Sequence, residues 1–486
     1  MDIFDKLLSE SKVNADLHLF LEDNIDELYD FLLTQSFSDL EVHKEKIERY
    51  ISANLRIIKQ LDFTIESTHV FALLLLDISE RFGFLMPFQQ LYNLLIKHNC
   101  EISSRLEASA LYLIGIKNII GYDNILEPLL DKLNHAYLEE DTEDKIISTI
   151  VNYYAEIAYN FGSQNLEGVL SIKSKILNKR NDPGFYFLKN NLINEVLIVD
   201  LTDHISSYKI IKNLLDVFLK RTKKYIPFDK KLFLIEKNTA YSKFLENVPS
   251  TFNAIKQISV NQYSLIKNDS IFYSLKSGVN ILTEESQLYA YLHSYGDMHY
   301  KKLSSAFKCL PPEILNSEIN IVDWGCGQGL ATISFIDYFN DNVKINHISL
   351  IEPSEIALKR AALHIVKFNE SISLKTINKD FDNLNSSDFL NKNQVPTLHL
   401  FSNIIDIDLF SLTELLKLIN STFDGENYFV CVSPCINVLR TGRLDRFMKS
   451  FSKNNGYQEI KSIDNEKGSW SGTSWSRVIR VFKATL

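Results

Sequence analysis

The stretch VDWGCGQGLAT, residues 322 to 332, constrains the fold more than any other part of this 486-residue chain. It places three glycines at alternate positions, Gly325, Gly327 and Gly329, after a short apolar run and before a helical pattern. Residues without a Cβ let the backbone turn sharply and approach a ligand closely. The stretch therefore predicts a strand, a ligand-binding turn and a helix in immediate succession.

The chain from about residue 319 onward alternates strands and helices. Short apolar runs are followed by helical patterns, and the last two runs, YQEIKSI and RVIRVFKA, come as a pair of strands. Such alternation predicts a mostly parallel, doubly wound sheet, whose ligands bind at the carboxyl ends of the strands. We therefore expect an α/β doubly wound C-terminal domain over residues 281 to 486.

Residues 1 to 280 show helical periodicity instead. Segments such as HVFALLLLDISERF, RLEASALYLIGIKNII and IISTIVNYYAEIAYNF place apolar residues three and four apart, which buries one stripe on each helix. We predict an all-α, solenoid- or bundle-like region that recognises a substrate or partner. The turn signal RNDPG, residues 180 to 184, marks a candidate subdivision.

Composition and charge narrow the class of protein. Hydrophobic residues make up 45% of the chain, as in a globular protein, and the formal charge of −9 argues against bulk nucleic-acid binding. The acidic start lacks the basic region of a secretory signal, and the longest apolar run, Val70 to Leu76, is too short to span a membrane. We expect a cytoplasmic protein with no membrane partner. The five scattered cysteines form no C-x-x-C pair, which predicts reduced thiols and no metal site.

The spacing of the glycines separates two classes of ligand. The dinucleotide fingerprint needs its last glycine one position later, where this chain has Leu330. Asp323 ends the first strand, where its charge would repel a phosphate and attract a cation. Glu352 ends the next strand about twenty positions after Gly329, and is placed to bind both hydroxyls of a ribose. S-adenosylmethionine, which has an ammonium group, a carboxylate and a ribose but no phosphate, satisfies these features.

With these residues the chain resembles the class I (Rossmann-like) S-adenosylmethionine-dependent methyltransferases over roughly residues 285 to 486. SLIEPS resembles their second motif, with Glu352 as the ribose acid. INKDF is similar to their third motif, which implies Asp380 near the adenine amino group and Phe381 against its ring. The final pair of strands is what the family's seven-stranded sheet implies. VDWGCGQG looks like their first motif, D-x-G-x-G-x-G, and implies cofactor contacts from Asp323, Gly325, Cys326, Gly327 and Gly329.

The acceptor side of the site follows from the same resemblance. LHLFSNIID lies where the family's fourth motif follows the fourth strand, which implies Asn403 as an orienting acceptor and Asp406 as a base. In the family the helix before the first strand closes over the cofactor, which implies that Tyr295 lines the site and that His299 is another candidate base. SNII lacks the proline and the aromatic residue of the amino-methylating nucleic-acid enzymes, so base flipping is unsupported.

Structural roles stay open for several of these residues. Glu352 can be a charge at a helix N-terminus, Asp380 a turn residue, and the aromatic residues around His299 part of a core. Arg440, Arg443 and Arg446 recur every third residue, and such a basic face is usually solvated. KRTKK, residues 220 to 224, is similarly ambiguous, and SWSGTSW, residues 469 to 475, predicts a flexible loop that borders a substrate mouth or ties the last hairpin to the core.

The sequence thus predicts an S-adenosylmethionine-dependent methyltransferase whose acceptor is a macromolecule, a protein or an RNA. Small-molecule methyltransferases seldom need a large helical addition, and helical arrays offer extended concave surfaces. The alternative is a catalytically silent cofactor-binding scaffold or sensor with a helical protein-interaction domain, which the absence of a recognisable fourth motif favours. The sequence sets neither the acceptor atom nor the oligomeric state.

Overall fold

The computed structural model describes residues 3–10, 13–116, 118–138, 143–162, 164–219, 221, 239–275, 278–389, 395–407, 409–435, 438–470 and 473–486. The chain divides into two compact units. The helical unit comprises Met1–Tyr225 and Asn437–Leu439, and the sheet unit comprises Ile226–Ile436 and Arg440–Leu486. Within the described ranges, no helix is both long enough and apolar enough to cross a membrane.

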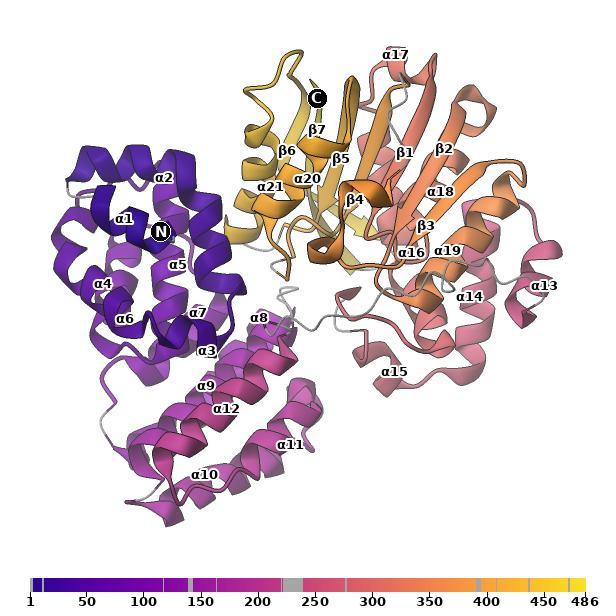
Figure 1. Cartoon of the computed structure of the whole chain (residues 1–486). Helices are drawn as coiled ribbons and strands as arrows, with labels where there is room; N and C mark the ends of the chain where they lie inside the picture. Colours follow the sequence, from indigo (N-terminus) through magenta and orange to yellow (C-terminus); the bar gives the residue numbers. More distant parts are fainter. Residues whose placement is uncertain are drawn as a thin grey trace. The chain divides into compact units, whose positions relative to one another are not determined.

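The helical unit consists of successive helices with short connections (Figure 1). A π-helical turn, η1 (Asp30–Thr34), continues α2, and a 3-10 helix, η2 (Pro183–Lys189), follows α10. The α-helices are α1 (Ile3–Glu10), α2 (Asn14–Tyr29), α3 (Phe37–Glu41), α4 (Lys44–Ile58), α5 (Glu66–Phe82), α6 (Leu85–Lys97), α7 (Ser104–Leu113), α8 (Ile119–Leu138), α9 (Glu143–Phe161), α10 (Leu166–Lys179), α11 (Asn191–Leu197) and α12 (His204–Phe218).

Helices α5 and α9 form the centre of this unit. Nearly every side chain from Thr68 to Phe82 on α5, and every one from Ile146 to Ala158 on α9, is buried. A helix buried on all sides needs neighbours all round it, and α9 contacts α7, α8, α10, α11 and α12. In a solenoid each repeat would contact only the next, so the arrangement is a bundle.

The turns in this unit follow from glycine and capping residues. RLEASALYLIGIKNII, predicted as one helix, holds nearly all of α7 and the start of α8. Gly115 between them has a φ of 86°, a left-handed conformation that interrupts a right-handed helix. At RNDPG, Asp182 caps η2 by accepting the amide hydrogen of Gly184, which confirms the predicted turn. Both sides of that turn belong to the helical unit, so no unit boundary falls there.

The sheet unit contains one seven-stranded sheet in the order β3-β2-β1-β4-β5-β7-β6. Strands β1 to β5 run parallel, and β7 lies antiparallel between β5 and β6. Figure 1 shows β6 and β7 at one edge and β2 and β3 toward the other. This arrangement confirms the predicted doubly wound, Rossmann-like sheet. The strands are β1 (Glu318–Trp324), β2 (Lys344–Ile351), β3 (Ser373–Ile377), β4 (Thr397–Ser402), β5 (Glu426–Ser433), β6 (Gln458–Trp470) and β7 (Thr473–Thr485).

Helices cover both faces of the sheet because successive side chains of a strand point to opposite faces. On β1, Ile319 and Ile321 join one apolar core, and Val322 and Trp324 join another. The first core includes α16 (Glu285–Phe307), α18 (Leu330–Phe339) and α19 (Glu355–Phe368). The second includes α20 (Leu412–Thr422) and α21 (Val438–Ser450). The carboxyl end of β1 therefore lies between the helices that cover the two faces of the sheet.

The shorter elements of the sheet unit are α17 (Pro312–Leu315), η5 (Asn340–Asn342), η6 (Phe381–Asn383) and η7 (Ser386–Asp388).

Three helices that precede residue 280 also belong to the sheet unit: α13 (Ala240–Glu246), α14 (Phe252–Ile266) and α15 (Asp269–Tyr273). Their apolar side chains, among them Tyr241, Leu245 and Ile255, lie in the same core as α16 and α18. The unit that holds the sheet thus begins earlier than the sequence predicts, because helical periodicity alone does not tell which core a helix joins.

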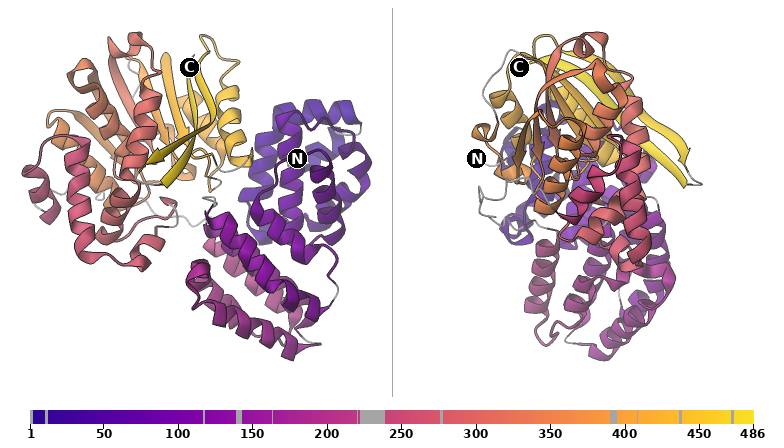
Figure 2. Two further views of the ribbon diagram at one scale, coloured as in Figure 1. Left: turned by 180° about the vertical axis from the view of Figure 1, so that it is seen from behind. Right: turned by 90° about the vertical axis from the view of Figure 1, so that its right-hand side faces the viewer.

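The hairpin of β6 and β7 extends past the rest of the sheet. β5 pairs with β7 from Val478 to Thr485, whereas the residues of β7 before Val478 pair with β6 alone (Figure 2). The prediction of a flexible loop at SWSGTSW is therefore wrong for 469–470 and 473–475, which continue the ladder of hydrogen bonds in β6 and β7. Residues 471–472 lie outside the described ranges, as does most of KRTKK.

Candidate active site

The glycine stretch forms the turn between β1 and α18. Gly325, Gly327 and Gly329 have φ values of 63°, 53° and 76°, where any side chain is strained. A Cβ on Gly325 would lie 2.5 Å from Ile404, and one on Gly329 would lie 3.1 Å from Ala361. A Cβ on Gly327 would meet no protein atom within 4 Å. Two glycines thus allow protein segments to pack, and Gly327 borders open space that a ligand can fill.

Glu352, at the end of β2, holds this turn. Its Oε2 accepts the amide hydrogen of Gly327 at 3.0 Å, and its Oε1 accepts that of Ser354 at 2.8 Å. The amide of Cys326 donates to the carbonyl of Ile351 at 2.8 Å. The predicted ribose acid therefore lies directly beside the glycine that borders open space.

Asp323 is buried behind the turn, with only 1% of its surface exposed. Its Oδ2 accepts hydrogen bonds from the amide (3.2 Å) and hydroxyl (2.7 Å) of Thr332 in the first turn of α18. Its Oδ1 is buried and has no hydrogen-bond partner in the described part of the chain. Burial raises the pKa of Asp323 to about 6, against the effect of the Thr332 hydrogen bonds. A ligand ammonium group would satisfy Oδ1 and stabilise the charge, so the carboxyl fits the predicted cofactor.

The two residues predicted around the adenine differ in their contacts. Phe381 packs edge-on against Phe410, with ring centres 4.8 Å apart, and its Cζ lies 3.7 Å from where a Cβ of Gly325 would be. Phe381 is thus beside the glycine turn. Asp380 caps η6, and its carboxylate accepts hydrogen bonds from the backbone amide and side-chain amide of Asn383. These contacts are those of a turn residue.

At the end of β4, the structure brings His299 and Asn403 together. Nδ2 of Asn403 lies 2.6 Å from Nδ1 of His299, and Nε2 of His299 lies 3.3 Å from the hydroxyl of Tyr291. Asn403 has a φ of 55°, a strained conformation for a residue with a side chain and one that recurs at functional sites. Burial, assisted by the charge of Lys302, lowers the pKa of His299 to about 3. The imidazole is therefore neutral and serves as a hydrogen-bonding group.

Tyr291, which sequence reasoning did not single out as a site residue, lies beside Tyr295 and His299. Its ring lies 5.3 Å from that of Tyr295 and 5.8 Å from that of His299, measured between ring centres. Burial raises the pKa of Tyr291, and so does the charge of Glu352. The sequence pattern could have indicated Tyr291, because positions 291, 295 and 299 recur at four-residue spacing and share one face of α16.

Asp406 lies in the segment that follows β4, and Arg443 of α21 contacts the same segment. The carboxyl of Asp406 is 4% exposed and accepts the hydroxyl hydrogen of Ser433 at 2.7 Å, at the end of β5. The expectation that Arg443 lies on a solvated face is wrong, since its side chain is fully buried. It donates to the carbonyls of Ile405 (2.8 Å) and Phe410 (2.7 Å). These backbone carbonyls, which sequence spacing does not reveal, explain a buried arginine at this place.

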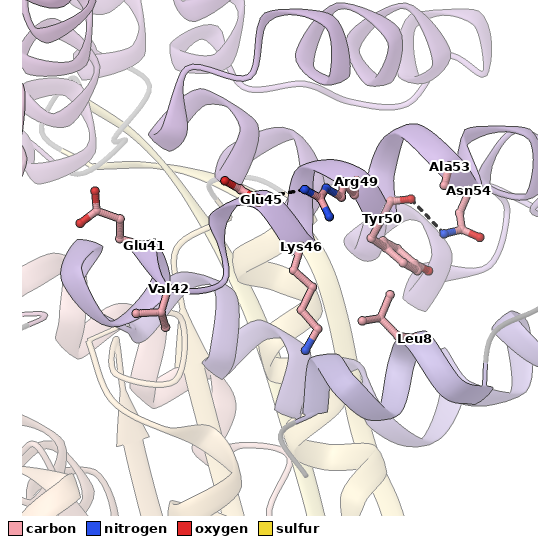
Figure 3. A pocket seen from close by; sticks show the side chains of 9 residues that line it. All are labelled: Leu8, Glu41, Val42, Glu45, Lys46, Arg49, Tyr50, Ala53 and Asn54. Carbon is pink, nitrogen blue, oxygen red and sulfur yellow. Dashed lines mark hydrogen bonds and ion pairs between the residues drawn. The ribbon is translucent and has the colours of Figure 1, made fainter. Parts of the chain in front are cut away.

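A separate surface hollow lies in the helical unit, beside α4 (Figure 3). Glu41, Glu45, Lys46 and Arg49 are among the side chains that line it. The pair of Arg49 and Glu45, 3.0 Å apart, is more than four-fifths exposed on both sides. Such solvated pairs contribute little to binding or stability. In the described ranges no group of three or more histidine, cysteine or acidic side chains could hold a metal ion.

Comparisons with known proteins find likeness in structure but not in sequence. No family model and no curated relative matches the chain. The plantazolicin methyltransferase BpumL, solved with a monoazolic desmethylPZN analog and SAH, is 12% identical, covers 47% of this chain and 99% of its own, and has a TM-score of 0.29. A SAM-dependent methyltransferase from Leishmania major is 10% identical, with 50% of this chain and 81% of its own covered and a TM-score of 0.26.

A third solved structure is the tRNA (m1A58) methyltransferase TrmI from Aquifex aeolicus. It is 16% identical, covers 38% of this chain and 68% of its own, and has a TM-score of 0.23. Likeness at this level assigns no substrate to this chain. The strand order and the glycine turn of the structure itself show that the sheet unit has the class I methyltransferase fold.

Proposed function

We propose that the sheet unit binds S-adenosylmethionine at the carboxyl end of β1 and transfers its methyl group. The observation that carries this proposal is Gly327, whose missing Cβ leaves open space beside the carboxylate of Glu352. Asp323 adds a buried oxygen without a hydrogen-bond partner in the described part of the chain. Together they suit a ligand with a ribose and an ammonium group, and their two carboxyl groups disfavour a phosphate.

The residues of the site would then have separate roles. Glu352 binds the ribose hydroxyls, Asp323 faces the ammonium group, and Phe381 packs against the adenine ring. When bound, S-adenosylmethionine supplies a methyl group activated by its positively charged sulfur. Transfer is an in-line displacement, so the protein has to align the acceptor and exclude water.

Asn403 and His299 would orient the acceptor. A group with a pKa of about 3 is a weak base near neutral pH, so we assign His299 to holding the Asn403 amide and not to removing a proton. Asp406 stays the candidate base, for acceptors that arrive protonated. Its hydrogen bond to Ser433 would fix the carboxylate at the end of β5.

We further propose that the acceptor is a macromolecule, a protein or an RNA, selected by the helical unit. The support is that this bundle is a compact unit with its own core, in addition to a sheet unit that has a complete cofactor turn. A small acceptor would need no such addition.

Titration calorimetry with S-adenosylmethionine and with NAD tests the cofactor. Binding of the first alone supports the proposal, and tight binding of NAD without a response to S-adenosylmethionine would refute it. Incubation with a labelled methyl donor and separate protein, RNA and metabolite fractions then tests transfer. Cofactor affinity without transfer to any fraction would favour the silent scaffold or sensor.

A further inference from the structure

Helix α13 reaches the glycine turn through two side chains. The hydroxyl of Tyr241 on α13 lies 2.7 Å from Nε2 of His364 on α19. Nδ1 of the same imidazole lies 2.8 Å from the backbone carbonyl oxygen of Gln328, between Gly327 and Gly329. Tyr241 and His364 are 1% and 0% exposed. A buried chain of hydrogen bonds thus ends inside the predicted cofactor turn.

The partners fix which nitrogen of His364 carries the proton. A carbonyl oxygen only accepts, so Nδ1 must donate to Gln328. Burial, followed by the charge of Arg360, lowers the pKa of His364 to about 3, and the ring is neutral near pH 7. Nε2 is therefore unprotonated and accepts the hydroxyl hydrogen of Tyr241. The Gln328 carbonyl thus selects the Nδ1–H tautomer, and the tyrosine hydroxyl matches it by donating to Nε2.

Tyr241 is itself held in place. The guanidinium carbon of Arg360 lies 3.3 Å from the centre of the Tyr241 ring, an attractive arrangement of a cation over an aromatic face. Nη2 of Arg360 lies 2.7 Å from Oε1 of Glu285 at the start of α16. The hydroxyl of Tyr241 is thereby aimed at His364 by groups from α16 and α19.

Gln328 is held from a second side as well. Its side-chain Nε2 donates to the carbonyl of Leu288 on α16 at 3.0 Å. The next amide, that of Gly329, donates to the carbonyl of Cys326 at 2.7 Å and closes the turn. The peptide after Gln328 is thus oriented by His364 on one side and by the closed turn on the other.

We propose that His364 and Tyr241 are positioning residues of the cofactor site, which hold the Gln328 peptide so that the turn at Gly327 is preformed for S-adenosylmethionine. The inference rests on the proposed function, and it adds two residues outside the motifs that the resemblance covers. A preformed turn binds its ligand without the entropy loss of ordering the backbone. It also explains why a helix that precedes residue 280 is part of this unit.

Calorimetric titration of the full-length chain with S-adenosylmethionine tests the proposal. We expect the dissociation constant of His364→Ala to rise about tenfold, the size of one well-placed hydrogen bond, and that of Tyr241→Phe to rise a few-fold. His364→Asn should stay within about twofold of wild type, because its amide can donate from the position of Nδ1. Tyr300→Phe is the control, since it removes a half-buried hydroxyl that donates to Asp337 at 2.8 Å, outside this chain of contacts.

Equal affinity of wild type and folded His364→Ala would overturn the inference and leave the proposed function standing. Failure of the wild-type protein to bind S-adenosylmethionine would refute both. Nitrogen NMR of the His364 ring measures the tautomer in the wild-type protein, so this test does not depend on whether a variant folds. We expect the Nδ1–H tautomer, and a ring protonated at Nε2 would contradict the proposed hydrogen bond to Gln328.

Discussion

The two units use buried polar groups in different ways. In the core of the helical unit, Arg81 pairs with Asp216 at 2.8 Å, and both side chains are less than 5% exposed. Glu80 nearby accepts hydrogen bonds from Tyr112 (3.1 Å) and Asn152 (3.0 Å). These acids and their partners come from α5, α7, α9 and α12, so the network joins the bundle's central helices to their neighbours.

In the sheet unit the buried groups at the site are incompletely matched. Oδ1 of Asp323 and Oδ1 of Asn403 are buried without a hydrogen-bond partner in the described ranges. Leaving such a group unpaired costs about 1–3 kcal/mol of folding free energy. A fold retains that cost where a ligand or water supplies the partner. The helical unit also has buried atoms without a partner, Nη1 of Arg81 among them, so an unmatched atom alone does not mark a site. Asp323 and Asn403 differ in their place, because both lie at the carboxyl ends of the paired strands β1 and β4, beside the glycine turn.

The largest expected effect concerns the boundary between the units. A fragment of residues 239–486 keeps α13 to α15, and we expect it to fold and to bind S-adenosylmethionine. A fragment of residues 281–486 loses seven buried apolar side chains of the shared core, Tyr241, Leu245, Phe252, Ile255, Ile258, Tyr263 and Leu275. At roughly 1.5–3 kcal/mol for each, the loss equals or exceeds the stability of a typical domain. Circular dichroism of both fragments measures the outcome, and a cooperatively folded shorter fragment would contradict it.

The next effect tests the network of the helical unit. Arg81→Met leaves Asp216 buried without its closest charged partner and should lower the free energy of unfolding of this unit by about 3–5 kcal/mol. Arg49→Met is the matched control, because its exposed pair with Glu45 contributes at most about 1 kcal/mol. Urea unfolding measures this free energy in both variants. The affinity of the folded Arg81→Met variant for S-adenosylmethionine should stay unchanged. A loss of affinity in that variant would contradict a purely structural role of this network.

Two glycines offer a matched pair for the site. Gly327 and Gly425 have φ values of 53° and 74°, and at both a Cβ would meet no protein atom within 4 Å. Alanine therefore introduces similar backbone strain at each, about 1–2 kcal/mol. Only Gly327→Ala should weaken S-adenosylmethionine binding, by about 100-fold or ~2.7 kcal/mol, because its methyl group would occupy the ligand's space. Parallel loss in both variants, or in neither, would remove Gly327 from the site.

The smallest effect is the pH dependence that Asp323 imposes. Its pKa in the folded protein, about 6, is above the usual value, so its contribution to stability is present at low pH and is lost as the pH rises through 6. A ligand cation prefers the ionised form, whose fraction falls between pH 6 and pH 5, so affinity should fall about fivefold over that range. Asp323→Asn should bind weakly at every pH and flatten this profile. An unchanged slope in that variant would show that another group titrates.

Local sequence patterns predicted the fold and the glycine turn, whereas they did not predict contacts between distant residues. The alternation of strand and helix patterns predicted the doubly wound sheet, because apolar side chains on strands such as β1 alternate between two cores. The glycine spacing located the turn, since only a residue without Cβ fits there. Contacts between residues far apart in the sequence could not be predicted. The spacing of Arg443 does not indicate its hydrogen bond to the carbonyl of Phe410. Likewise, no residue near Tyr241 indicates its contact with His364, 123 residues later.

Hydrogen–deuterium exchange of the full-length chain, with and without S-adenosylmethionine, tests the central claim most directly. It reads both units in one experiment, and NAD serves as the comparison ligand. The account predicts slower amide exchange in 325–332 and 351–355, around the glycine turn and Glu352, with no change in the helical unit's α5, α9 and α12. Protection confined to those helices, or no protection at the turn in the presence of saturating S-adenosylmethionine, would contradict it.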